Sequence, residues 1–256
     1  MLLPRVLTAL VGVPLLLFLI HWGGLSFSLL VAGVCALCLY EYGVIMLVGR
    51  KPVRRTVAAL CGAALALCTA FEGPLNLVLA ACAAAIVLVE LFSKDHDIER
   101  AALTLFGSLL LGWMPAHLAL IRDLRPYGER LTFMVFVSIW ACDTAAYFAG
   151  RAFGKHKLAP VVSPKKTWEG FVAGFAAAFA VVFAFRPYVQ LALPRAVAVA
   201  CALGLLGQLS DLAESMIKRA VGAKDSGALL PGHGGVMDRF DSFILAAPAV
   251  YYCLVL

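Results

Sequence analysis

The sequence predicts an all-α polytopic membrane protein with about nine transmembrane helices. Residues are 63% hydrophobic and only 14% charged, and the mean hydropathy is +0.94. A typical soluble domain is about a quarter charged. A chain this apolar could not cover itself with polar surface in water, so the lipid bilayer is its natural solvent.

The chain divides into apolar segments close to the length of about 20 residues that a spanning helix needs. The segment at 56–71 is short, and Pro248 interrupts the last one. We expect one transmembrane domain over 1–256, in which 1–131 serve structure or dimerisation and 132–256 carry the chemistry. The segments run 4–22, 25–48, 56–71, 75–92, 101–121, 132–150, 168–186, 195–219 and 239–256.

The first segment has a signal peptide as its alternative interpretation, because Arg5 precedes an apolar run. No small-x-small cleavage site follows that run. It meets His21-Trp22-Gly23-Gly24 and then another apolar segment. We therefore expect a first helix that is retained.

The positive charge of the chain sorts to one side of the predicted membrane. A net charge of +6 in a soluble protein would suggest a nucleic acid partner, which we do not expect here. Loops rich in Lys and Arg are typical of the cytoplasmic side, and they can also bind phosphorylated substrates. The sorting predicts a cytoplasmic N-terminus, with the polar connections 151–167 and 220–238 also cytoplasmic. Of the 21 Lys and Arg residues, the opposite side would hold only Arg122, Arg125, Arg130, Arg186 and Arg195.

Four polar residues share one face at the end of an apolar helix. Asp211, Glu214, Ser215 and Lys218 are spaced i, i+3, i+4 and i+7. Two acids near lipid are costly, which favours metal or phosphate binding. The alternative is a solvated helix end in which an Asp pairs with a Lys.

The next segment combines a glycine-rich loop with paired carboxylates. In Pro231-Gly232-His233-Gly234-Gly235, the glycines would let backbone N–H groups approach an anion, unless the loop is simply a flexible turn. Asp238 and Asp241 follow at i and i+3. Paired carboxylates beside basic residues suit Mg²⁺ held with phosphate oxygens. The alternative is a helix start whose acids favour the dipole.

A second cluster lies between 143 and 170. Asp143 sits inside an apolar run, and an intramembrane acid is a candidate functional residue, although it could form an interhelical ion pair. Tyr147 lies one turn further on. The run Ser163-Pro164-Lys165-Lys166-Thr167-Trp168-Glu169-Gly170 opens the next helix. Its lysines and the helix N-terminus predict an anion site, with a basic membrane-surface loop as the alternative.

These runs resemble motifs of the phosphatidate cytidylyltransferase, or CDP-diacylglycerol synthase, family. The run S-x-x-K-R-x₄-K-D-S-G-x-x-x-P-G-H-G-G-x-M-D-R-F-D, from Ser215 to Asp241, is similar to the family signature. S-P-K-K-T-W-E-G and D-x-x-A-Y resemble two further motifs. The resemblance is detailed in the C-terminal half and rests on hydropathy alone in the N-terminal half.

The resemblance implies the reaction CTP + phosphatidate → CDP-diacylglycerol + pyrophosphate, Mg²⁺ dependence and a homodimer. It implies that Asp211, Asp238 and Asp241 are metal ligands or support them, and leaves a second, monovalent cation open. Phosphate contacts would come from Lys165, Lys166, Lys218, Arg219 and Lys224. The candidate catalytic residues are Asp211, Lys218, Arg219, Lys224, Asp225, His233, Asp238 and Asp241. The candidate substrate-binding residues are Asp143, Tyr147, Ser163, Lys165, Lys166, Thr167, Glu169, Glu214, Ser215, Gly234, Gly235 and Arg239.

The implied substrates predict the architecture of the site. The phosphatidate phosphate is already an anion, so the reaction needs no strong general base and His233 need not act as one. CTP arrives from the cytoplasm, whereas phosphatidate stays in the leaflet. We therefore expect a polar cavity among the helices, open to the cytoplasmic side and to the inner leaflet. The compact chain suggests a bacterial cytoplasmic membrane.

Three other functions remain as alternatives. A CDP-alcohol phosphotransferase has differently spaced aspartates, and in this sequence Asp211 is not followed by glycine. A lipid or polyprenol kinase that uses CTP is harder to exclude. An ion-coupled transporter would use buried acids as ion sites, but transporters usually show paired repeats with matching broken helices.

Overall fold

The computed structural model describes residues 3–227 and 234–256, with side chains from Leu10 onward. The chain forms two compact units, each described here by itself. The first unit comprises Met1–Leu120 and Lys218–Phe240, and the second comprises Ile121–Ile217 and Asp241–Leu256. The expected division of roles at residue 131 stays a prediction.

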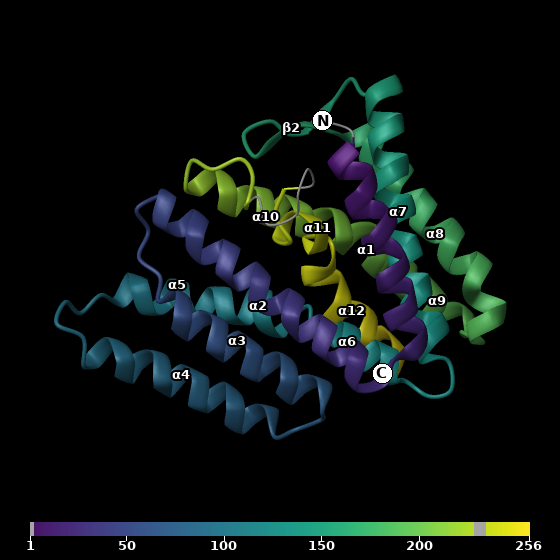
Figure 1. Cartoon of the computed structure of the whole chain (residues 1–256). Helices are drawn as coiled ribbons and strands as arrows, with labels where there is room; N and C mark the ends of the chain where they lie inside the picture. Colours follow the sequence, from purple (N-terminus) through teal and green to yellow (C-terminus); the bar gives the residue numbers. More distant parts are fainter. Residues whose placement is uncertain (1–2, 228–233) are drawn as a thin grey trace. The chain divides into compact units, whose positions relative to one another are not determined.

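The first unit is a bundle of apolar helices built on α2 and α3, which pack against each other (Figure 1). α3 ends at Ala70, and a turn through Gly73 leads to Pro74, which is the N-cap residue of α4. Asp97 caps α5 by accepting hydrogen bonds from two amides of the first turn. The elements are α1 (Leu3–Trp22), α2 (Gly24–Val48), α3 (Arg55–Ala70), α4 (Leu75–Leu91), α5 (Ile98–Gly107), the π-helix η1 (Ser108–Trp113) and α11 (Met237–Phe240).

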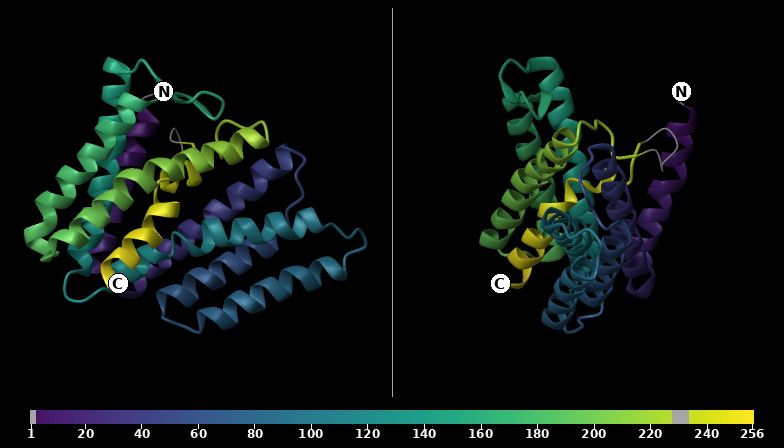
Figure 2. Two further views of the ribbon diagram at one scale, coloured as in Figure 1. Left: turned by 180° about the vertical axis from the view of Figure 1, so that it is seen from behind. Right: turned by 90° about the vertical axis from the view of Figure 1, so that its left-hand side faces the viewer.

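The second unit is built on α7 and α8, which run side by side in both views (Figures 1 and 2). α6 (His117–Asp123) begins in the first unit and ends in the second, and α10 passes from the second into the first. The elements are α7 (Gly128–Phe153), β1 (Lys157–Ala159), β2 (Ser163–Thr167), α8 (Trp168–Val189), α9 (Leu193–Cys201), the π-helix η2 (Ala202–Leu206), α10 (Gly207–Ala220) and α12 (Phe243–Val255).

Small residues let α7 and α8 approach each other closely. A Cβ on Gly170 would lie 2.6 Å from the carbonyl oxygen of Ala146, and one on Gly174 would lie 2.9 Å from that of Cys142. On α7, Ala146 and Gly150 repeat the same i, i+4 spacing of small residues, a pattern typical of membrane helix pairs. The backbones of the two helices are therefore in direct contact.

The helical membrane character predicted from hydropathy is confirmed, whereas the number of spans stays a prediction. Within the described residues, five helical segments are long and apolar enough to cross a membrane, and three further apolar helices are shorter. The helix α12 has 13 residues. The five segments are Gly24–Val48, Ile98–Asp123, Gly128–Phe153, Trp168–Val189 and Leu193–Ala220.

The all-α prediction was wrong for the polar connection 151–167, because this connection contains two short β-strands. β1 and β2 pair as an antiparallel hairpin in which Lys157 lies opposite Thr167. The amide of Trp168 donates to the carbonyl of His156 and closes the base of the hairpin at 3.0 Å. The backbone of this lysine-containing segment therefore bonds between two strands rather than within a helix.

Candidate active site

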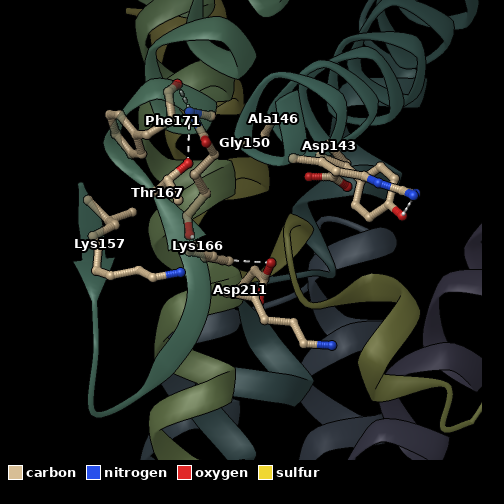
Figure 3. A pocket seen from close by; sticks show the side chains of 14 residues that line it. Asp143, Ala146, Gly150, Lys157, Lys166, Thr167, Phe171 and Asp211 are labelled. Carbon is tan, nitrogen blue, oxygen red and sulfur yellow. Dashed lines mark hydrogen bonds and ion pairs between the residues drawn. The ribbon is translucent and has the colours of Figure 1, made fainter. Parts of the chain in front are cut away.

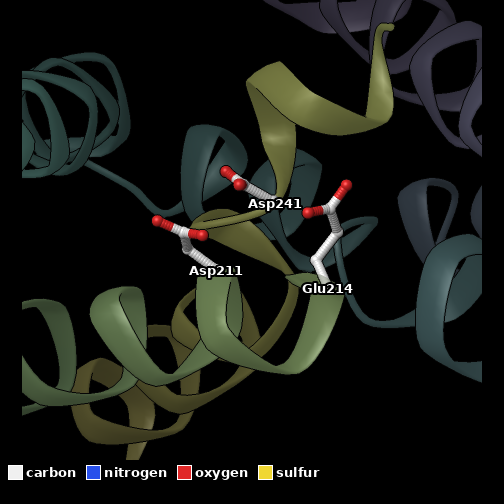
Figure 4. A group of neighbouring side chains, drawn as sticks. All are labelled: Asp211, Glu214 and Asp241. Carbon is white, nitrogen blue, oxygen red and sulfur yellow. The ribbon is translucent and has the colours of Figure 1, made fainter. Parts of the chain in front are cut away.

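Three acidic side chains of the second unit converge on one point (Figure 4). Asp211 and Glu214 lie on α10, and Asp241 follows α11. Each offers a carboxylate oxygen, and these atoms all lie within 4.8 Å of one another. Like charges this close disfavour joint ionisation unless a cation lies between them. Hard oxygen ligands of this kind suit a divalent cation such as Mg²⁺, so the cluster could hold a metal ion.

Ser210 fixes the backbone at Asp241 and in the turn that follows it. Its buried hydroxyl donates to the carbonyl of Asp241 and accepts from the amide of Leu245, at 3.1 Å in the second case. The amide of Ser242 donates to the carboxylate of Asp241 at 2.6 Å. The position of this acid is therefore set by α10 as well as by its own segment.

Replacing Ser210 with alanine should destabilise the protein. Ser210→Ala would leave the partly buried amide of Leu245 without this acceptor, which costs about 1–3 kcal/mol in the free energy of unfolding, while the carbonyl of Asp241 keeps its bond from the amide of Ile244. Thermal unfolding in detergent measures the effect, with Ser215→Ala as the control because Ser215 is only partly buried. Equal melting temperatures for the two variants would contradict this role of Ser210.

The start of α10 is tied to α8 through Gln208. Its side-chain amide donates to the carbonyl of Gly204 at 2.7 Å and to that of Phe171 at 3.0 Å. Gly204 belongs to the π-helix η2, where the wider turn alters the regular backbone bonding. π-Helical turns are frequent at functional sites, and Asp211 follows this one by less than two turns of helix.

A cavity of about 530 Å³ lies beside the acidic cluster in the same unit (Figure 3). Asp143 and Tyr147 on α7 form one wall, and basic residues of the hairpin form another. Lys166 reaches from β2 to Asp211, with 2.7 Å between ammonium nitrogen and carboxylate oxygen. Asp211 thus belongs to both the cavity and the acidic cluster. The lining residues are Asp143, Ala146, Tyr147, Gly150, Arg151, Lys157, Leu158, Lys165, Lys166, Thr167, Gly170, Phe171, Gln208 and Asp211.

The structure gives two predicted substrate-binding residues of this region local structural partners. The hydroxyl of Thr167 accepts from the amide of Gly170 at 3.2 Å and caps α8. The carboxylate of Glu169 accepts from the backbone amide of His156 and contacts its ring nitrogen at 2.7 Å. These contacts hold the hairpin at the start of α8. Binding of substrate by either residue stays a prediction.

In the first unit, Asp238 is paired with Lys218 at 2.6 Å. Its other carboxylate oxygen accepts from the amides of Ser226 and Gly235, at 3.1 and 3.0 Å. Burial alone would raise the pKa of Asp238, but Lys218 and the two amides outweigh it and hold that pKa below its usual value. Asp238 is therefore an anion with three donors, whereas Glu214 is the acid that joins Asp211 and Asp241. A metal-binding role for Asp238 stays a prediction.

The remaining predicted residues lie near the acidic cluster, near the pair of Asp238 with Lys218, or at the surface. Ser215 donates to Asp211 at 3.4 Å, and Arg219 donates to the carbonyl of Ala223 at 3.1 Å. Gly234 has a φ of +85°, which glycine adopts readily. The predicted residue His233 lies outside the described residues. Lys165, Lys224, Asp225 and Arg239 are exposed, and Ser163 is partly buried.

Sequence reasoning missed several residues of these sites. Gln208 and Ser210 are polar residues in an apolar segment, a signal that could have been used. Glu41 is an acid inside the second apolar segment, and the argument applied to Asp143 covers it equally. Arg151 and Lys157 line the cavity but gave no separate signal.

Comparisons with known proteins agree with the motifs. Residues 3–256 match the model of the cytidylyltransferase family. The phosphatidate cytidylyltransferase of Bacillus subtilis is 32% identical over 265 residues, covering 98% of this chain and 97% of the relative. That of Brucella suis is 35% identical over 252 residues, covering 96% and 91%. That of Staphylococcus epidermidis is 44% identical over 135 residues, 52% of each chain. The chain belongs to the cytidylyltransferase family.

Proposed function

We propose that this chain transfers the cytidylyl group of CTP to phosphatidate, giving CDP-diacylglycerol and pyrophosphate. The observation that carries the proposal is the ion pair between Lys166 and Asp211, which joins a basic cavity to an acidic cluster. Two polyanionic substrates need both features, because cations must offset phosphate charge and carboxylates can hold a divalent metal. The family and the names of the full-length relatives support the same reaction.

In the reaction, a phosphate oxygen of phosphatidate forms a bond to the α-phosphorus of CTP. The bond from that phosphorus to the oxygen bridging to the β-phosphate breaks, and pyrophosphate leaves with the electron pair. Lys165 and Lys166 offset the charge of the phosphates. A Mg²⁺ ion held by Asp211 and Asp241, with Glu214 beside them, would supply Lewis-acid stabilisation of the leaving group.

We further propose the setting in which this chemistry takes place. The chain crosses a bacterial cytoplasmic membrane about nine times, with its N-terminus and its active site on the cytoplasmic side. The cavity lined by Asp143 and Lys166 receives CTP from the cytoplasm and the phosphatidate headgroup from the inner leaflet. The working form is a homodimer.

The test is the formation of product by the detergent-purified chain. We expect release of pyrophosphate and formation of CDP-diacylglycerol only when CTP, Mg²⁺ and phosphatidate are all present, and loss of both products with EDTA. A lipid phosphate in place of CDP-diacylglycerol would instead indicate a CTP-dependent lipid kinase. No product from a folded, lipid-supplied sample would contradict the proposal.

A further inference from the structure

The second helix of the chain buries an acid that the reaction described above does not use. Glu41 lies on α2, is only 1% exposed, and sits within a segment apolar enough to span a membrane. A buried carboxylate is costly unless its oxygens are well satisfied. Its partners therefore indicate what it does.

Glu41 accepts three hydrogen bonds from the signature segment of its own unit. One carboxylate oxygen accepts from the amide of Val236 at 3.0 Å. The other accepts from the amide of Met237 at 2.8 Å and from the hydroxyl of Ser226 at 3.1 Å. All three donors are buried, and they lie 185 to 196 residues further along the chain. Hydrogen bonds to a charged acceptor are the stronger kind.

Two glycines of the signature allow this close approach. A Cβ on Gly227 would lie 2.8 Å from a carboxylate oxygen of Glu41. A Cβ on Gly235 would lie 2.5 Å from the other oxygen and 1.8 Å from the hydroxyl of Ser226. Any side chain at either position would displace the carboxylate or the backbone. The glycines of the family signature thus fit the shape of Glu41.

Asp238, which pairs with Lys218, also binds the backbone of the same segment. One of its carboxylate oxygens accepts hydrogen bonds from the amides of Ser226 and Gly235, while the other pairs with Lys218. Ser226 is therefore bound through its hydroxyl to Glu41 and through its amide to Asp238. Glu41 and Asp238 therefore both bind the backbone around Ser226 and Gly235. A shift of the Glu41 carboxylate would shift the amides that bind Asp238.

We propose that Glu41 is a positioning residue for cytidylyl transfer, which fixes the backbone that sets Asp238 and its pair with Lys218. Glu41 acts through that backbone and does not itself contact a substrate. The proposal rests on the proposed function, since it takes Asp238 and Lys218 as part of the active machinery. It assigns a catalytic purpose to a residue of the N-terminal helices.

The carboxylate is the group that this position requires. A carboxylate offers two oxygens that only accept, which matches two amide donors and a hydroxyl. Glu41→Gln keeps the shape but replaces one oxygen with an NH₂ group, which would face an N–H or O–H donor. Glu41→Asp keeps the charge but shortens the side chain by one methylene. The two variants separate the effect of charge from that of reach.

Glu90→Gln is the matched control for the loss of a buried carboxylate. Glu90 is 6% exposed, lies on α4 of the same unit, and is bonded to Arg54 and Arg100 rather than to the signature segment. The experiment measures kcat and KM for CTP per folded enzyme, the melting temperature, and hydrogen exchange of peptides covering 234–240. All three variants are purified as the full chain in detergent.

We expect Glu41→Gln to lower kcat at least about tenfold with little change in KM, and to speed the exchange of the Val236 and Met237 amides. Glu41→Asp should give an intermediate kcat. Glu90→Gln should lower the melting temperature at least as much while keeping kcat within about twofold of wild type.

Two outcomes would overturn the proposal. One is a Glu41→Gln enzyme with wild-type kcat, and the other is an equal loss of kcat in Glu41→Gln and Glu90→Gln, which indicates a purely structural role. If Glu41→Gln does not fold, the same comparison is made with Glu41→Asp. A wild-type chain that forms no CDP-diacylglycerol would contradict the proposed function, while amide exchange would still report whether Glu41 holds the segment.

Discussion

Asp211→Asn should abolish cytidylyl transfer. Asp211 belongs to both the acidic cluster and the cavity, and its loss removes a carboxylate ligand while releasing Lys166. Lewis-acid stabilisation is worth several kcal/mol, so we expect kcat to fall at least about a hundredfold. Asp241→Asn should act in the same direction. The measurement is CDP-diacylglycerol formation from radiolabelled CTP over a range of Mg²⁺ concentrations.

The control for Asp211→Asn is Asp95→Asn, in the connection between α4 and α5. Asp95 is exposed and pairs with Arg100. Its replacement should keep kcat within about twofold, because an exposed surface ion pair contributes little. Wild-type activity in Asp211→Asn would contradict the metal site. A rate restored at high Mg²⁺ would instead show that Asp211 contributes to metal affinity more than to the chemical step.

Lys166→Met should be the most damaging replacement among the basic residues of the hairpin. Its ammonium lies 2.7 Å from Asp211 and faces the cavity, so the variant loses a positioned cation where phosphate charge develops. Removal of one such donor typically costs about 10²–10³ in kcat. Lys166→Arg should recover only part of the rate, because a planar guanidinium does not occupy the position of an ammonium.

Lys155→Met is the matched control in the connection that leads into the same hairpin. Lys155 is exposed and is not among the described residues that line the cavity. We expect a change in kcat/KM of less than about threefold, since an exposed charge is screened by salt. Equal losses in Lys155→Met and Lys166→Met would indicate a general attraction of anions by the hairpin rather than a specific contact.

Hydropathy was enough to predict the helices, because a bilayer forces the backbone of an apolar segment to bond within itself. The spacing of Asp211 and Glu214 also predicted a shared face. Spacing alone could not show which acid completes the cluster, because both Glu214 and Asp238 stand three residues from a partner. Glu214 lies near Asp241 in the folded chain, where Ser210 binds the backbone at Asp241 and at Leu245. Those contacts connect residues about 30 positions apart, which no local pattern contains.

The hairpin and the contacts of Glu41 escaped prediction for different reasons. Residues 151–167 lack the alternation of apolar and polar residues that marks a strand, since the hairpin is mostly exposed. Glu41 is visible in the sequence as an acid in an apolar run, but its hydrogen-bond partners are amides almost 200 residues away. Its burial and its three donors depend on how the chain folds.

The direct contact between the backbones of α7 and α8 has a consequence for how this enzyme can change. Both helices contribute walls to the cavity. Their spacing is set by direct contact of the two backbones at Gly170 and Gly174, rather than by interlocking side chains. Residues that point into the cavity can therefore be exchanged without moving the frame. A single replacement at another lining position can therefore change the shape of the cavity, while a methyl group added at Gly170 or Gly174 would push the two helix backbones apart.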